Sequence, residues 1–290
     1  MKILITGSTG HLGSATIDFL ISKISASNIV ALARNPEKTK ALTEKGIEVR
    51  IGNYDDSSSL VQAFQGIDKL LLISTSELTN RTEQHINAIN AANEAGVKHI
   101  VYTSFLRQKD DPESALWFIA KDHIETEKHL EKVGIPYTFF KNAFYMDMIT
   151  DIIGSNVLET KTIFYPAAEG KVNYALRIEI AEALANVLTS EDHENKSYNI
   201  GCETTVSFAE IAGFISEVSG TKINYISPTV EAYKQALAQY NVPEMYIKIF
   251  AAFAVAFSEN AMNVPTPDFN MLLGRKATDV KTLVTKLFKK

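Results

Sequence analysis

The sequence has little of what would mark a secreted, membrane-spanning or nucleic-acid-binding protein. Its single cysteine, Cys202, excludes an internal disulfide and a cysteine-rich metal site. The apolar run IFAAFAVAF, at 249–257, is much shorter than the roughly 20 residues that cross a bilayer. Met1-Lys2 leads straight into a strand pattern with no export signal, and a net charge of -5 offers no basic surface. We therefore expect a cytoplasmic chain with no membrane or nucleic-acid partner.

The first half of the chain alternates short apolar runs with helical patterns. The runs are rich in Ile, Val, Leu, Tyr and Phe and are nearly continuous, which is typical of a parallel sheet buried on both faces. They lie at 2–6, 28–34, 47–52, 69–74, 99–104 and 136–141. Between them lie helical patterns such as 82–96, which Gly96 closes at a C-cap position. Because parallel strands need right-handed crossover connections, we predict an α/β fold with a doubly wound parallel sheet of the Rossmann type.

The pattern changes after about residue 142. Helical patterns at 178–189, 207–219, 229–240 and 244–258 are separated by short strand candidates at 196–201 and 222–227, and a last helix closes the chain. We expect residues 1–142, with part of 175–205, to form the Rossmann domain. Residues 143–174 and 206–290 are expected to form a smaller α+β lobe that binds the substrate.

A glycine loop lies between the first strand and the first helix, in the stretch ILITGSTGHLG at 3–13. The spacing is G-x-x-G-x-x-G, in the strand–loop–helix setting that a dinucleotide site requires. Gly7 permits a tight turn, Gly10 allows the backbone to approach a pyrophosphate, and Gly13 lets the helix pack closely. Free amides and the helix dipole favour a diphosphate there. We predict a dinucleotide site at Gly7, Ser8, Thr9, Gly10, His11, Leu12 and Gly13.

The end of the second strand indicates which dinucleotide is bound. An NAD site usually has Asp or Glu there, whereas this strand ends ALARNPEK, with Arg34 and no carboxylate before Glu37. A guanidinium binds a phosphate bidentately and stacks on adenine, so NADPH is favoured over NADH. Lys38 is a second candidate, or else a helix-surface lysine. Turns after the other strands should complete the site, unless they are ordinary polar turns. These candidates are Asn53, Tyr54, Ser74, Thr75, Ser76, Thr103, Ser104 and Asn142.

Several segments resemble the atypical short-chain dehydrogenases/reductases with NmrA-like domains. They are ITGSTGHLG, ALARNPEK, KLLLISTSE, AGVKHIVYTS, HIETEKHLEKVGIPYTFFKNAFY and AAEGKVNYALR. Within that group the sequence is most similar to bacterial flavin-free NADPH-dependent quinone oxidoreductases, with triphenylmethane reductases as near relatives. The resemblance runs along nearly the whole chain and is weakest after residue 240. It implies hydride transfer from NADPH to a small quinone-like or aromatic acceptor, without flavin or metal.

The Tyr-x-x-x-Lys pair of the wider superfamily is missing. If Glu127 matches the glutamate that often follows that pair, His123 stands at the lysine position and Ile119 at the tyrosine position. Ser104 then takes the place of the superfamily's serine. Hydride addition to a quinone makes a phenolate with a pKa near 10, which water can protonate, so orientation of the reactants can suffice. His123 is either a proton donor or quinone partner, or a polar residue that serves the structure.

The segment after the sixth strand is expected to contact the acceptor. Phe144, Tyr145 and Met146 could stack on a flat aromatic ring, although core packing would explain them equally well. Ala143 and Arg177 are further substrate candidates. No clustered His, Asp and Glu pattern suggests a metal site.

Other functions and assembly states stay open. One alternative is a redox-sensing regulator of the NmrA kind, which binds NAD(P) without catalysis. A tyrosine-independent reductase or isomerase of sugars or phenylpropanoids is another. The sequence is compatible with a monomer or a homodimer.

Overall fold

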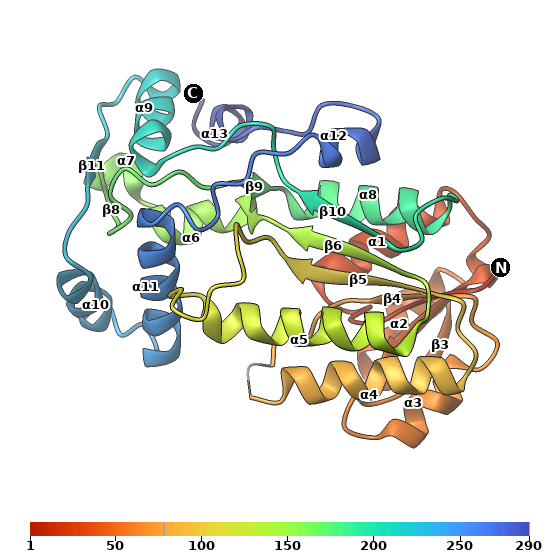
Figure 1. The fold of residues 1–290 in the computed structure, drawn as a ribbon. Coiled ribbons are helices and arrows are strands. Elements are labelled where there is room, and N and C mark those ends of the chain that lie inside the picture. The colour runs from red at the N-terminus through yellow and green to blue at the C-terminus, as the bar shows by residue number, and fades with distance from the viewer. Residues whose placement is uncertain (78, 290) are drawn as a thin grey trace.

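A computed structural model describes residues 1–77 and 79–289, and it contains one large sheet between two layers of helices (Figure 1). Within these residues the sheet has seven strands in the order β10-β6-β5-β4-β1-β2-β3, and every pairing is parallel. The strands are β1 (Ile3–Ile5), β2 (Ile29–Ala33), β3 (Glu48–Ile51), β4 (Lys69–Leu72), β5 (His99–Phe105), β6 (Tyr137–Asn142) and β10 (Lys196–Ile200). The predicted doubly wound fold is confirmed.

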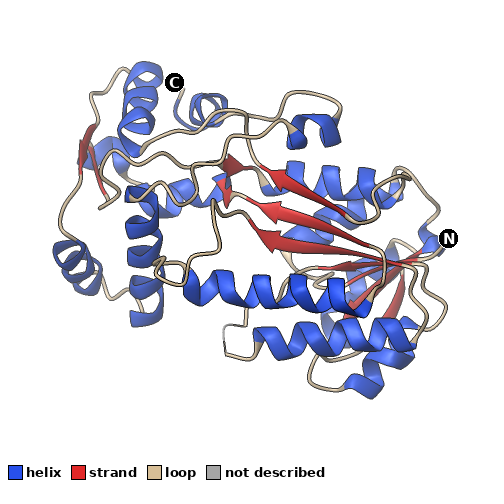
Figure 2. Cartoon of the chain, in the orientation of Figure 1, coloured by secondary structure: helices blue, strands red, loops and turns tan. Residues whose placement is uncertain are grey.

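Helices cover both faces of this sheet (Figure 2). Neighbouring residues of β1 explain why, since Ile3 and Ile5 pack into one apolar core and Leu4 packs into another. On one face α1 packs beside α8, and on the other α3, α4 and α5 lie in a row. The bounds are α1 (His11–Ile21), α2 (Lys40–Glu44), α3 (Ser57–Phe64), α4 (Arg81–Glu94), α5 (Trp117–Val133) and α8 (Arg177–Leu188), with 3-10 turns η1 (Ala26–Asn28), η2 (Pro36–Thr39) and η3 (Met146–Met148).

A second group of elements packs beyond the carboxyl ends of the central strands. Its apolar core includes Tyr165, Phe208 and Phe257. A capping box between Ser207 and Glu210 starts one of its helices. Its helices are α6 (Ile149–Ile153), α7 (Val157–Thr160), α9 (Phe208–Ser219), α10 (Val230–Gln239), α11 (Glu244–Ser258) and α13 (Val280–Phe288), and its strand pairs are β7 (Phe144–Tyr145) with β9 (Tyr174–Ala175) and β8 (Thr162–Phe164) with β11 (Asn224–Ile226).

One late segment returns to the large sheet. Helix α12 (Asp268–Leu273) packs against α8 and β10, and Phe269 belongs to the core of α1 and α8. From the sequence this segment is expected in the substrate lobe, although it packs on elements of the large sheet. The division of the chain into a Rossmann domain and a substrate lobe stays a prediction. The apolar run at 249–257 lies in α11, and none of the described helices is long and apolar enough to cross a membrane.

Candidate functional site

A cavity of about 460 Å³ opens at the carboxyl ends of β1, β2 and β4. In this sheet order the chain leaves β1 for β2 on one side, while β4 pairs with the other side of β1. Such a switch point is where open α/β sheets bind ligands. The lining consists of residues 7–13, Leu32, Ala33, Arg34, Gly52, Tyr54, Ile73, Ser74, Thr75, Ser76, Tyr145 and Arg177.

The glycine loop forms the floor of this cavity. Gly7 has a φ of 59°, in the left-handed region that favours glycine, and its carbonyl oxygen accepts the Gly10 N–H at 2.9 Å. A methyl group at Gly13 would run into that same carbonyl, so the close packing is between the helix and the loop itself. Within the described chain no acceptor is recorded for the N–H groups of residues 11–13, at the positive end of α1. The loop therefore fits a dinucleotide diphosphate.

The side chains of the glycine loop differ in their exposure and in their hydrogen bonds. The Ser8 hydroxyl is buried and donates to the Leu32 carbonyl at 2.7 Å, which ties the loop to β2. Thr9 and His11 are exposed on the cavity, and Leu12 is buried beneath it. Ser8 can therefore offer a ligand only its backbone.

One end of the cavity carries a cation that has no ion pair among the described residues. Arg34 is exposed directly after β2, and no ion pair or hydrogen bond is recorded for it among the described residues. The Tyr54 hydroxyl is buried near the Thr6 side chain, and burial raises the pKa of Tyr54. Asn53 does not line the cavity, because its side chain accepts the Asp55 N–H within its own turn. Lys38 lies on the exposed turn η2, also off the cavity.

At the other end, Tyr145 and Arg177 lie together. The guanidinium carbon of Arg177 is 5.6 Å from the centroid of the Tyr145 ring, a cation–π arrangement. Asp147 fixes Arg177 by accepting its backbone N–H at 2.9 Å, and the guanidinium lies 3.5 Å from the same carboxylate. A half-buried aromatic face beside a fixed cation suits a flat, electron-poor ring.

Three of the expected substrate residues do not reach this cavity. Phe144 and Met146 are buried in the second core, where Phe144 packs edge-on against Phe253 and Phe257. Ala143 is buried in the core beside α1 and α8. The alternation of side chains beyond β6 therefore leaves Tyr145 as the aromatic residue of this segment that faces the cavity.

The polar residues at the ends of β5 and β6 lie behind the cavity wall. Thr103 accepts the backbone N–H of Ser74 at 2.8 Å, and Ser104 donates its hydroxyl to Glu127. Asn142 is buried, and its side-chain oxygen has no recorded partner. By contrast, the candidates that follow β4, Ser74, Thr75 and Ser76, line the cavity directly.

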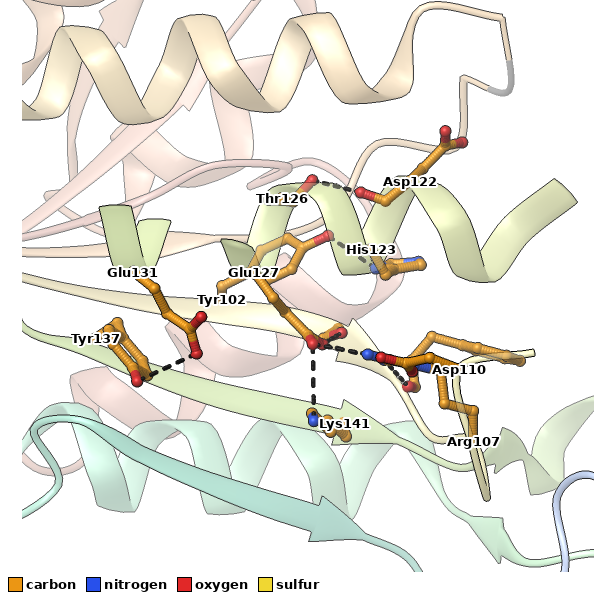
Figure 3. Close-up of polar contacts among 12 residues, drawn as sticks. Tyr102, Arg107, Asp110, Asp122, His123, Thr126, Glu127, Glu131, Tyr137 and Lys141 are labelled. Atoms are coloured by element: carbon orange, nitrogen blue, oxygen red, sulfur yellow. Dashed lines mark hydrogen bonds and ion pairs between the residues drawn. The ribbon is translucent and has the colours of Figure 1, made fainter. Parts of the chain in front are cut away.

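His123 is packed inside the protein at 5 % exposure. Its Nδ1 lies 2.7 Å from the Tyr102 hydroxyl, and its ring stacks on Phe105 at a centroid distance of 6.0 Å (Figure 3). Burial holds the pKa of His123 well below its usual value. The ring does not line the cavity, so its position favours the structural role over proton donation.

Glu127 is the centre of an ion cluster that the sequence did not reveal. Arg107 donates to it at 2.7 and 3.1 Å, the Lys141 ammonium lies 3.7 Å away, and Ser104 donates its hydroxyl (Figure 3). Arg107 also donates to the Phe105 carbonyl at 3.0 Å. Burial alone would lower the pKa of Arg107. The hydrogen bonds to Glu127 and its negative charge outweigh this effect, so the pKa of Arg107 is raised.

Comparison with known proteins agrees with this geometry. The NmrA-like family matches residues 1–284. The chain belongs to the NmrA-like family. The chain is 36% identical over 286 residues to quinone oxidoreductase 2 of Escherichia coli. That match covers 99% of this chain and 98% of the E. coli protein. It is 28% identical to the NAD(P)H azoreductase of Xenophilus azovorans, with 83% and 82% of the two chains covered.

Solved structures extend the likeness to the whole NmrA-like fold. Citrobacter sp. triphenylmethane reductase complexed with NADP(H) has a TM-score of 0.91 at 38% identity, with 99% of this chain and 100% of that chain covered. The NADPH complex of the E. coli quinone oxidoreductase has a TM-score of 0.92 at 36% identity, with the same coverage. The regulator NmrA itself has a TM-score of 0.77 at 14% identity, which shows a shared fold alone. The predicted resemblance is confirmed.

The residues missed from the sequence have weak sequence signals. Arg107 lies in the loop after β5, and the chain folds it back onto α5. Lys141 could have been found, because it stands opposite Ser104 when β5 and β6 pair in register. Ile73 and Gly52 line the cavity simply because they follow strand ends in this family's sheet.

Proposed function

We propose that this chain is an NADPH-dependent reductase that transfers a hydride directly to a quinone or a similar conjugated electrophile, with no flavin or metal. One observation carries the proposal. A single cavity joins the diphosphate cradle at residues 7–13 to Arg34 and Tyr54 at one end and to Tyr145 and Arg177 at the other. That order matches a dinucleotide with its adenosine end at Arg34, and a hydride acceptor bound beside Tyr145.

The choice of NADPH rests on the charge at the end of β2. Arg34 is exposed there, and the strand end offers no carboxylate to accept ribose hydroxyls. A 2′-phosphate would supply the anion that Arg34 lacks. The relatives with solved NADP(H) complexes support this choice.

The side chains on the cavity bind and orient the reactants rather than transfer protons. NADPH supplies the hydride when it is bound. The amides of residues 11–13 hold the diphosphate, and Tyr145 presents an aromatic face to the acceptor. A reduced quinone leaves as a phenolate with a pKa near 10, which solvent water protonates. Catalysis then comes from holding the nicotinamide and the acceptor close together in the right orientation. This explains how the chain would act without the Tyr–Lys pair.

The test is NADPH oxidation followed at 340 nm, with and without a simple benzoquinone, and repeated with NADH. We expect quinone-dependent turnover that prefers NADPH. Arg34→Ala should raise the KM for NADPH roughly ten- to a hundred-fold, because a charge-assisted pair is lost, and leave the KM for NADH nearly unchanged. Lys38→Ala is the control cation and should change neither. Tight NADPH binding without turnover of any quinone or triarylmethane dye would overturn the proposal and favour a non-catalytic regulator.

A further inference from the structure

The wall of the cavity after β4 has an unusual backbone arrangement. Residues 73–75 have left the sheet, yet each of their N–H groups donates to a buried side chain. The three acceptors come from three different elements, at distances of 2.9, 2.8 and 3.1 Å. They are the Oγ1 atoms of Thr6 and Thr103 and the Nε2 atom of His85. Although these amides are bound inside the protein, residues 73–76 line the cavity.

The backbone of Thr75 is held at its N–H and at its carbonyl by side chains of one helix. His85 accepts its N–H, and Arg81 donates from Nε to its carbonyl at 3.1 Å. Arg81 and His85 are four residues apart on α4, so they lie on the same side of the helix. Both side chains are buried. The position of α4 therefore fixes the backbone of Thr75, the residue between Ser74 and Ser76.

The partners of His85 determine where its proton lies. Nε2 accepts the Thr75 N–H and so carries no proton, which leaves the proton on Nδ1. Nδ1 is 3.0 Å from Thr126 Oγ1. The Thr126 hydroxyl donates its own hydrogen to the Asp122 carbonyl at 2.6 Å (Figure 3). The Nδ1 hydrogen of His85 therefore points to Thr126, with the Tyr102 hydroxyl 3.3 Å from the same nitrogen. Burial, with the nearby Arg81, lowers the pKa of His85 to about 3, which keeps the ring neutral.

We propose that His85 is a positioning residue for the nicotinamide half of the bound dinucleotide, acting through the Thr75 peptide. The sheet order supports this placement, because Arg34 follows β2 on one side of β1 and residues 73–76 follow β4 on the other. A diphosphate on the glycine loop after β1 lies between them. The adenosine half extends toward Arg34, and the ribose and nicotinamide extend toward Ser74 and Ser76. The inference rests on the dinucleotide site of the proposed function.

The experiment compares two ligands on one variant. His85→Leu removes the acceptor for the Thr75 N–H. We expect the Kd for NADPH to rise on the order of ten-fold, because the Thr75 N–H is left without its buried acceptor. The Kd for adenosine 2′,5′-bisphosphate should stay within two-fold, because that probe lacks the nicotinamide half. If His85 had a merely structural role, His85→Leu would raise the Kd for both ligands equally. That result would overturn the inference.

The control is His99→Leu. His99 is also buried and also bonds a threonine, with Nε2 2.8 Å from Thr138 Oγ1, but it lies at the amino end of β5. We expect lower stability without any change in either Kd.

A conservative variant keeps the test decisive where His85→Leu does not fold. The side-chain oxygen of His85→Gln reaches roughly the place of Nε2, whereas that of His85→Asn falls short. Binding of NADPH should be near wild type in the glutamine variant and weak in the asparagine variant. Equal binding by both would overturn the inference. All these binding assays are independent of quinone turnover, so an inactive wild type would refute the proposed reductase without deciding the role of His85.

Discussion

At the scale of single residues, the cavity depends on positions where one added carbon would meet backbone. Gly13 is the clearest, because its α-carbon faces the Gly7 carbonyl with no room for a methyl group. We expect Gly13→Ala to displace the first turn of α1 and to raise the Kd for NADPH at least ten-fold, since the amides of residues 11–13 would move. Titration of NADPH fluorescence measures this.

Gly213→Ala is the matched control for that substitution. Gly213 is exposed within α9, and a methyl group there meets nothing within 4 Å. It should stabilise the protein by up to about 1 kcal/mol, because alanine favours a helix over glycine, and leave the Kd unchanged. Unchanged NADPH binding by Gly13→Ala would contradict the assignment of the loop.

At the scale of residues, the sequence indicates a position on the cavity where the signal is local, while the roles of these residues stay predictions. The glycine loop and Arg34 follow strand ends directly, so their place on the cavity could be predicted. The direction in which Phe144 and Met146 point could not be predicted. It depends on β7, a two-residue strand that forms only by pairing with β9. His123 was ambiguous for the same reason, since its partner Tyr102 is on another element.

At the scale of elements, the ion cluster around Glu127 joins α5 to the carboxyl ends of β5 and β6. Glu127 and Arg107 are each only 9% exposed in their side chains. We expect Glu127→Gln to lower the free energy of unfolding by about 3 kcal/mol, because Arg107 keeps its burial but loses its bidentate partner. Urea denaturation followed by circular dichroism measures this.

Glu131→Gln on the same helix separates this effect from a general loss of charge. Glu131 is exposed and accepts only a 3.4 Å hydrogen bond from Tyr137. Its loss should cost less than about 0.5 kcal/mol. Equal effects of the two substitutions would show that the buried cluster contributes nothing of its own.

The elements of the large sheet were predictable because each strand is a short run buried on both faces. Their bounds differ from the expected ones by a residue or two at the ends, as for β4, which stops at Leu72. The short elements β8, β11 and α12 carry little periodicity of their own. They exist through tertiary contacts, such as Phe269 of α12 in the core of α1 and α8, and the sequence alone does not specify such contacts.

At the scale of the whole molecule, several neutral histidines couple folding to pH. Burial lowers the pKa of His85 to about 3 and that of His99 to about 4, and it also lowers the pKa of His123. In the unfolded chain these rings titrate near 6.5. Between about pH 6.5 and pH 4 the unfolded state therefore binds more protons than the folded state does, and stability falls as the pH falls.

We expect the free energy of unfolding to drop by roughly 1–2 kcal/mol per buried ring between pH 7.5 and pH 5. The drop is below the full 1.36 kcal/mol per pH unit because the unfolded rings bind most of their protons only below about pH 6.5. Urea titrations at the two pH values measure the change. His99→Leu should be less stable at pH 7.5 but should lose less on acidification, since one of the titrating rings is gone. A wild-type stability that does not change across this interval would mean that the buried rings accept protons in the folded state. The Thr75 N–H would then have lost its acceptor on His85 without unfolding the chain, and NADPH binding would weaken before stability did.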